Sequence, residues 1–128
     1  MIVAKFDKNC RLSCRIRDFT IYSDVRPASG GDDTAPEPPE YTAASLAMCV
    51  GTYFVFYCNQ HDLDPCGFEV SVEPEVAEAP KRFVKYTVNF TFPPEFPEAR
   101  KKAAKAFATA CPVGNTLERG CTVEFNFN

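Results

Sequence analysis

The stretch from Tyr41 to Gln60 constrains the fold most, because it is twenty residues long and contains no charged side chain. Large apolar side chains recur through it, namely Leu46, Met48, Val50, Phe54, Val55 and Phe56. Pro38 and Pro39 precede it, and Glu40 adds a negative charge where a helix N-terminus favours one. We therefore expect a helix from Pro38 to about Asn59 that is apolar nearly all round and central to the fold.

Twenty uncharged residues also meet the length of a membrane span. The composition argues against that alternative, because Ser45, Thr52 and Asn59 interrupt the apolar run and acidic residues flank it at Glu40 and Asp62. No lysine or arginine lies close by as an interfacial anchor. A helix buried within a soluble domain or dimer explains the same apolarity, and we expect no membrane partner.

The length of 128 residues predicts a single domain, residues 1–128, because one core is still growing at that size. Asp and Glu number 17 against 14 Lys and Arg, so the net charge of −3 provides no attraction to nucleic acid. The densest basic cluster lies among alanines and is typical of the solvated face of a helix. Its members are Arg100, Lys101, Lys102 and Lys105.

Alternating apolar and polar residues predict six strands, at 2–6, 10–16, 19–22, 68–73, 84–92 and 121–128. Residues 25–39 are rich in Pro, Gly and Asp and indicate a long loop. Pro93, Pro94 and Pro97 introduce a second helix that reaches about Ala110 and ends before Pro112. The order is β-β-β-α-β-β-α-β, which makes the fold class α+β.

Seven cysteines are many for a cytoplasmic chain, yet Met1 to Asn9 contains no apolar signal-peptide core, so we expect a cytoplasmic protein with reduced thiols. Cys49 lies about 16 Å along its helix from Pro38, beyond the range in which the helix dipole stabilises a thiolate. Cys111 lies at the negative end of the second helix, which disfavours a thiolate. Taken alone, both thiols could be inert packing groups.

The remaining cysteines offer no clear site. Cys58, His61 and Cys66 have a spacing that could bind zinc, but a fourth ligand is missing, so we expect no metal and no cofactor. Cys10 and Cys14 would stand about 13 Å apart on a straight strand, too far for a disulfide, and are expected to face the core. Cys121 fits the apolar face of the last predicted strand.

Two segments together resemble the OsmC/Ohr family. The Gly-rich run from Gly30 leads through Pro38-Pro39-Glu40 into the Ala-rich segment that ends at Cys49, and Cys111-Pro112-Val113-Gly114 resembles the second cysteine motif of the family. The resemblance implies an OsmC-like fold and an intertwined homodimer, with its two long apolar helices at the centre and the paired cysteines near the subunit interface.

Characterised members of that family reduce organic hydroperoxides. The first cysteine becomes a sulfenic acid, and the second condenses with it to a disulfide. Carried over, Cys49 is the peroxidatic and Cys111 the resolving cysteine. The resemblance also implies that a dithiol, often lipoyl-linked, reduces the pair again.

One feature of the family pattern is absent. In the peroxidase branch a glutamate ten residues before the first cysteine holds an arginine that activates the thiolate, but Pro39 occupies that position. Glu40 lies about 180° around a regular helix from Cys49. Arg26 is the one arginine in the long loop and matches no motif residue. Arg11, Arg15 and Arg17, contributed across a dimer, are further candidates for the missing positive group.

Two hypotheses follow from this pattern. The first is a thiol-dependent peroxidase that uses Cys49 and Cys111. The second is a dimer of the same fold with weak or no peroxidase activity, which binds a small apolar ligand or a thiol-bearing partner. The two cysteines favour the first, and Pro39 in place of the glutamate motivates the second.

Overall fold

The computed structural model describes residues 1–127. The chain forms two compact units, one comprising residues 1–42 and the other the residues from 43 onward. Strands and helices are mixed in the order expected of an α+β fold, although the last predicted strand is missing. The single domain expected from chain length stays a prediction.

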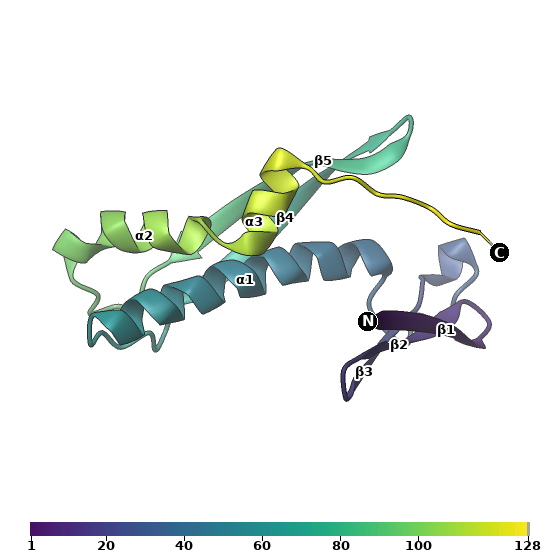
Figure 1. Ribbon diagram of the computed structural model, residues 1–128, viewed down its shortest axis with the longest axis horizontal. Coiled ribbons are helices and arrows are strands. Elements are labelled where there is room, and N and C mark those ends of the chain that lie inside the picture. Colours follow the sequence, from purple (N-terminus) through teal and green to yellow (C-terminus); the bar gives the residue numbers. More distant parts are fainter. Residues whose placement is uncertain (128) are drawn as a thin grey trace. The chain divides into compact units, whose positions relative to one another are not determined.

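The first unit contains an antiparallel sheet of three short strands in the order β1-β2-β3 (Figure 1). Its strands are β1 (Ile2–Lys8), β2 (Arg11–Ile16) and β3 (Phe19–Ser23). In the register, Cys14 lies opposite Ala4 on one side and Ile21 on the other, so these apolar residues share one face. The three predicted N-terminal strands are therefore confirmed.

Cys10 differs from its prediction as a core-facing strand residue. It lies in the turn between β1 and β2, next to Asn9 with a φ of 50°, and its side chain is exposed. Asparagine is one of the few residues that adopt this left-handed conformation at low cost, so the turn includes Cys10 and β2 begins one residue later.

Asp24 organises the loop that follows β3. Its carboxylate is 1% exposed and accepts hydrogen bonds from the Thr34 hydroxyl (2.7 Å), the Thr34 N–H (3.0 Å) and the Val25 N–H (2.8 Å). The Asp24 N–H in turn donates to the Pro36 carbonyl. Led by the bond from the Thr34 hydroxyl, these contacts lower the pKa of Asp24 to about 2. The loop, which includes the short helix η1 (Pro27–Ser29), is thus closed at both ends by one buried carboxylate.

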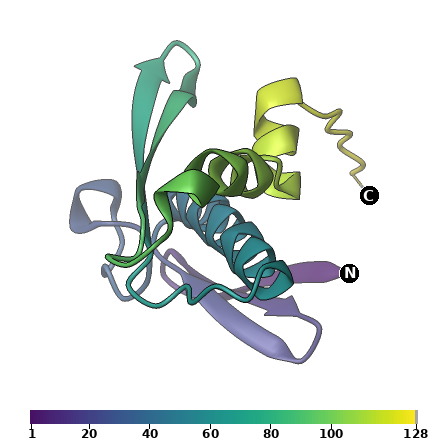
Figure 2. The same cartoon turned by 90° about the vertical axis from the view of Figure 1, so that its left-hand side faces the viewer.

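The longest helix begins in the first unit and continues through the second. The predicted helix start at Pro38 is confirmed. The remaining elements are α1 (Pro38–Gln60), β4 (Glu69–Glu78), β5 (Lys81–Thr91), η2 (Glu98–Arg100), α2 (Lys101–Thr109) and α3 (Pro112–Arg119). The strands β4 and β5 form a long antiparallel hairpin, and α2 runs beside α1 (Figures 1 and 2).

The core of the second unit is built on one side of α1. Phe54 is fully buried, stacks on Phe68 with 4.0 Å between ring centroids, and meets Phe90, Phe92 and Phe96 at 5.4 to 5.8 Å. Aromatic groups at these distances stabilise a core beyond the area that they bury. The side chains of this core that are at most 7% exposed are Leu46, Val50, Phe54, Tyr57, Cys58, Phe96, Ala104, Ala108 and Cys111.

The sequence predicts a helix that is apolar nearly all round and buried within a domain or dimer, and within the described chain only one side of α1 is buried. Met48 is 65% exposed and Phe56 is 45% exposed. Among residues 1–127, α1 is the one helix long and apolar enough to cross a membrane. Leu46, Val50 and Phe54 pack into the core.

The strand expected at 121–128 is wrong as far as the structure describes it. Residues 121–127 form no strand, and Asn128 lies outside the described residues. Their apolar side chains are exposed, with Val123 at 67% and Phe125 at 76%. A strand needs a second backbone to satisfy its N–H and C=O groups, and within residues 1–127 no strand pairs with this segment.

Two prolines have roles beyond those predicted. The second helix ends before Pro112 as predicted, since α2 ends at Thr109, but Pro112 also occupies the first position of α3, where its missing N–H is not needed. Pro74 directly follows the strand predicted at 68–73, yet it lies inside β4 opposite Tyr86, because β4 continues to Glu78. A two-stranded ribbon tolerates proline because half of its N–H groups point away from the partner strand.

We predict a specific acid sensitivity from Asp24. Because its folded-state pKa is lowered from 3.8 to about 2, the ionised carboxylate stabilises the fold above pH 4, and this contribution is lost as the pH falls toward 2. Asp24→Asn should therefore lower the urea midpoint at pH 7, and the difference from the wild type should shrink below pH 4. Asp18→Asn is the control, since Asp18 is fully exposed. A difference that does not vary with pH would contradict the assignment.

Candidate functional site

Cys49 lies near the middle of α1 and is half-buried. Leu46 and Val50, which flank it on the helix, are both buried, and the Cys49 side chain packs against the same core. Backbone N–H groups in the middle of a helix are already bonded to carbonyls one turn earlier. The helix backbone therefore offers the Cys49 sulfur no hydrogen-bond donor.

Cys111 occupies the short connection between α2 and α3. Its backbone is extended, with φ −79° and ψ 153°, and it is the N-cap residue of α3. The Sγ atom accepts a hydrogen bond from the Gly114 N–H at 3.3 Å, and the side chain is 0% exposed. This corrects the prediction that Cys111 lies at an unfavourable helix C-terminus. Because Pro112 starts a new helix, the sulfur instead faces the positive end of a helix dipole.

The structure packs the Cys49 and Cys111 side chains in the same core, near enough for Cys49 to influence the Cys111 thiol, although they are far apart in the sequence. Burial raises the pKa of the Cys111 thiol, the Gly114 N–H lowers it in part, and the neighbouring Cys49 raises it further. The raised pKa favours the neutral form of the Cys111 thiol. Both cysteines are free thiols, with Cys111 inside the core cluster and Cys49 packed against it.

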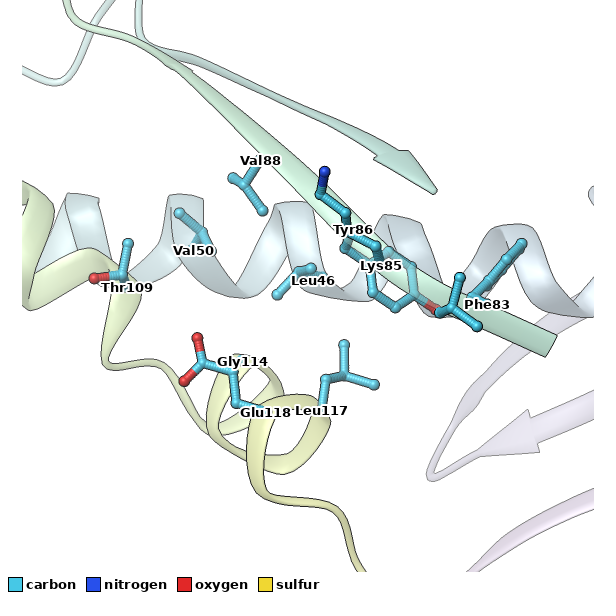
Figure 3. Close-up of a pocket in the computed structure, with 11 residues that line it drawn as sticks. Leu46, Val50, Phe83, Lys85, Tyr86, Val88, Thr109, Gly114, Leu117 and Glu118 are labelled. Atoms are coloured by element: carbon cyan, nitrogen blue, oxygen red, sulfur yellow. The ribbon is translucent and has the colours of Figure 1, made fainter. Parts of the chain in front are cut away.

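A cavity of about 410 Å³ is lined by neighbours of both cysteines, with Val50 next to Cys49 on α1 and Gly114 next to the Cys111 sulfur (Figure 3). Leu46 and Val50 contribute to it from α1, Tyr86 and Val88 from β5, and Leu117 from α3. The lining is mostly apolar, and its charged members are Lys85 and Glu118. Sequence reasoning did not find this cavity, because its residues come from separate elements and no spacing pattern connects them.

Gly114 connects the cavity to the cysteine pair. It lines the cavity, and a Cβ atom added to it would lie 3.2 Å from the Cys111 Sγ and 3.8 Å from a methyl group of Leu46. The bare backbone of Gly114 thus separates the open space from the buried sulfur. No larger residue would fit there without moving the sulfur or the α3 backbone.

Arg26 is held by two glutamates within residues 1–42. Its Nε lies 3.5 Å from Glu37 and its terminal nitrogen 3.8 Å from Glu40, while Glu40 also accepts a hydrogen bond from the Glu37 N–H at 2.9 Å. Sequence reasoning examined only Pro39 and Glu40, and could not see that the loop returns Arg26 to the start of α1. A glutamate-held arginine is therefore present, in a form different from the family pattern.

The other candidate arginines have different partners. Arg11 pairs with Asp7 at 3.0 Å and stacks on Tyr22. Arg15 donates to the Arg17 carbonyl, and Arg17 lies over the ring of Phe19. Within residues 1–127, Arg26 is the arginine that forms ion pairs with the start of α1 and the residue before it.

The residues considered for zinc do not form a cluster. Cys58 is fully buried, and burial raises the pKa of its thiol, whereas Cys66 is exposed. His61 lies 3.3 Å from Arg100. Over residues 1–127 the structure contains no group of three His, Cys, Asp or Glu side chains that could hold a metal ion. Cys121, expected on a strand, is exposed in the segment after α3.

Comparison with solved structures identifies the fold. A protein from Psychrobacter arcticus 273-4, named for osmotic stress induction and a detoxification response, is 23% identical, with a TM-score of 0.81 over 90% of this chain and 85% of that one. An OsmC-like protein from Mycoplasma pneumoniae is 16% identical, with a TM-score of 0.78 over 92% and 86%. The organic hydroperoxide resistance protein OhrB of Bacillus subtilis is 19% identical, with a TM-score of 0.57 over 91% and 87%.

At these identities the structural likeness shows the fold alone. A search of curated proteins finds no match. The family model described as OsmC-like protein matches residues 30–126, a range that contains the loop, α1, the hairpin and both members of the cysteine pair. Because this match covers most of the sequence, the chain belongs to the OsmC-like protein family.

Proposed function

We propose that this protein is a thiol-dependent peroxidase that reduces organic hydroperoxides with Cys49 and Cys111. The observation that carries the proposal is that the two thiols, one on α1 and one at the start of α3, pack in one core and influence each other. Family membership supports it, as does the presence of organic hydroperoxide resistance proteins among the structural neighbours. An inert packing role for both cysteines would not require them to meet.

In the first step the Cys49 thiolate attacks the terminal oxygen of the hydroperoxide. A sulfur–oxygen bond forms, the oxygen–oxygen bond breaks, and the alkoxide leaves and takes up a proton as the alcohol. Cys111 has a pKa raised by burial and by Cys49, so it is protonated during this step. Its S–H then donates to the Cys49 thiolate and stabilises the attacking charge.

In the second step the Cys111 sulfur attacks the sulfenic acid on Cys49. The disulfide forms, and the hydroxyl group leaves as water with the proton of Cys111. Because the two thiols already pack in one core, we expect this condensation to need no large rearrangement of α1 or α3. A dithiol reductant, which the family resemblance implies to be lipoyl-linked, then restores both thiols by exchange.

We also propose a cytoplasmic location, because free cysteines are typical of a reducing compartment.

We also propose a homodimer. The exposed side of α1 includes Met48 and Phe56, and the segment 121–127 exposes alternating apolar residues without a strand partner. An uncharged helix face and an unpaired strand pattern are the surfaces that a second copy of the chain would cover. The dimer therefore accounts for both places where the sequence predicted burial and the described chain shows exposure.

The cavity supports a second candidate function. Its volume of about 410 Å³ and its apolar lining match the properties of a small-ligand site. In this alternative the protein binds a small apolar molecule or a thiol-bearing partner without turning over peroxide. Saturable hydroperoxide turnover with a dithiol would remove it.

The first prediction from the proposal concerns the cysteines. Cumene hydroperoxide consumption with dithiothreitol should fall at least about 100-fold in Cys49→Ser, because the nucleophile is lost. In Cys111→Ser a sulfenic acid should accumulate on Cys49, to be trapped with dimedone and mapped by mass spectrometry. Cys66→Ser is the matched control, since Cys66 is an exposed thiol outside the pair. Consumption that persists unchanged in Cys49→Ser would refute the proposal.

The second prediction concerns Arg26. Arg26, paired with Glu37 and Glu40, is our candidate for the positive group that the family pattern supplies to the thiolate. A charge-assisted hydrogen bond is worth about 1.5–3 kcal/mol, so if Arg26 fills that role its loss should slow hydroperoxide reduction by roughly 10- to 100-fold. Arg26→Ala is the test, with the rate followed in single turnover at pH 7. Arg82→Ala is the control, because Arg82 is exposed and donates to the Pro80 carbonyl within its own hairpin turn. Equal rates in the two variants would remove Arg26 from the mechanism.

The third prediction concerns assembly. Light scattering after gel filtration should give twice the chain mass of 14.3 kDa for the wild type. Met48→Glu places a charge on the exposed apolar side of α1 and should shift the population toward the monomer. Lys102→Glu, on the exposed side of α2, should not. A wild-type protein of single-chain mass is the result that would exclude the dimer.

A further inference from the structure

We infer that reduction of the disulfide runs in one direction: the thiolate of the reductant attacks the Sγ of Cys49, and Cys111 leaves as a thiolate held by the Gly114 N–H. The inference rests on the proposed function, and it adds which sulfur receives the reductant and which residue stabilises the leaving group. Two observations carry it, the unequal accessibility of the two sulfurs and the capping bond at the start of α3.

The two sulfurs differ in their accessibility to solvent. Cys111 is 0% exposed, whereas Cys49 is half-buried. An attacking thiolate must approach one sulfur from the side opposite the disulfide bond, so the attacked sulfur needs open space behind it. On the cavity side, the Gly114 backbone stands against the Cys111 Sγ, as the 3.2 Å position of an added Cβ shows. Gly114 itself lines the cavity (Figure 3), so this backbone is the part of the Cys111 surroundings that faces the open space.

The two sulfurs also differ in how well each is stabilised as the leaving thiolate. The Gly114 N–H is a first-turn donor of α3 with no partner inside the helix, and it points at the Cys111 Sγ from 3.3 Å. A negative charge that develops on this sulfur therefore meets a donor already in place and the positive end of the helix dipole. Cys49, in the middle of α1, has no free backbone N–H nearby.

Burial opposes this arrangement, because it raises the pKa of Cys111 and disfavours any charge on its sulfur. The Gly114 N–H acts in the opposite sense on the same atom. A thiol that leaves more readily speeds exchange, so this donor matters most at the moment when the disulfide opens. Gly114 is thus a positioning residue for the reductive step.

The exchange balances with a dithiol as reductant. Its first thiolate forms a bond to the Cys49 Sγ, the Cys49–Cys111 bond breaks, and the electron pair goes to the Cys111 Sγ. The second thiolate of the dithiol then attacks the reductant's own sulfur in this mixed disulfide and expels the Cys49 thiolate. The dithiol is oxidised to its cyclic disulfide by two electrons, and the protein disulfide is reduced by two.

The direction of attack can be tested without peroxide chemistry. Diamide converts the reduced protein to its disulfide, one equivalent of N-acetylcysteine is added briefly, and N-ethylmaleimide then caps new thiols before peptide mapping. We expect the N-acetylcysteine adduct on Cys49 and the maleimide on Cys111, in roughly tenfold or greater excess over the reverse pattern. Equal labelling, an adduct mainly on Cys111, or no Cys49–Cys111 disulfide with diamide would overturn the inference. The expected pattern in a protein without hydroperoxide turnover would instead refute only the proposed function.

The role of Gly114 has its own readout. In a Cys49→Ser background, iodoacetamide labelling of Cys111 is followed against pH, with circular dichroism as the check on folding. Gly114→Pro removes the donor and should move the labelling midpoint to higher pH, because the thiolate loses its hydrogen bond. Gly114→Ala adds the same Cβ atom beside the Cys111 Sγ but keeps the N–H donor, and should leave the midpoint lower than in Gly114→Pro. Equal midpoints in the two variants would overturn the assignment.

Discussion

The burial of one side of α1 around Phe54 is the constraint on which the site depends. Phe54 contacts the ring of Phe68 directly before β4, the ring of Phe90 on β5 and the ring of Phe96 in the segment before α2. The helix therefore cannot rotate without opening that cluster. Leu46 and Val50 continue the same buried side toward the start of the helix. Cys49, which lies between them in the sequence, is therefore held half-buried against the core at the place where Cys111 meets it.

Much of this architecture was predictable because its signals are local. The uncharged run and the two prolines before Tyr41 placed α1, and alternation placed the N-terminal strands and the hairpin. The two cysteine motifs indicated the pair and the family to which the chain belongs. Local patterns of this kind carry their information within a few residues and do not depend on which partner the chain finds.

The remainder depended on partners that a spacing cannot show. The segment after Gly120 has the alternation of a strand, but a strand exists only where another backbone accepts its hydrogen bonds. In the sequence, Pro112 is compatible with the end of one helix and with the start of another. Which of these forms beside Cys111 determines whether its sulfur meets the negative or the positive end of a helix dipole. The Arg26 ion pairs form because the loop returns to the start of α1. The hydrogen bond from the Thr34 hydroxyl to the buried Asp24 carboxylate holds that loop closed.

Cys111 has two roles that place different demands on its side chain, the capping of α3 and the supply of a thiol to the pair. Serine, asparagine and aspartate are the preferred residues at a helix N-cap, and a thiol is a weaker acceptor than any of their oxygens. The α3 helix would be served at least as well by an oxygen at this position. A serine at position 111 would remove the thiol from the pair and would still cap α3. A form of the chain that resists oxidation therefore need not be less stable.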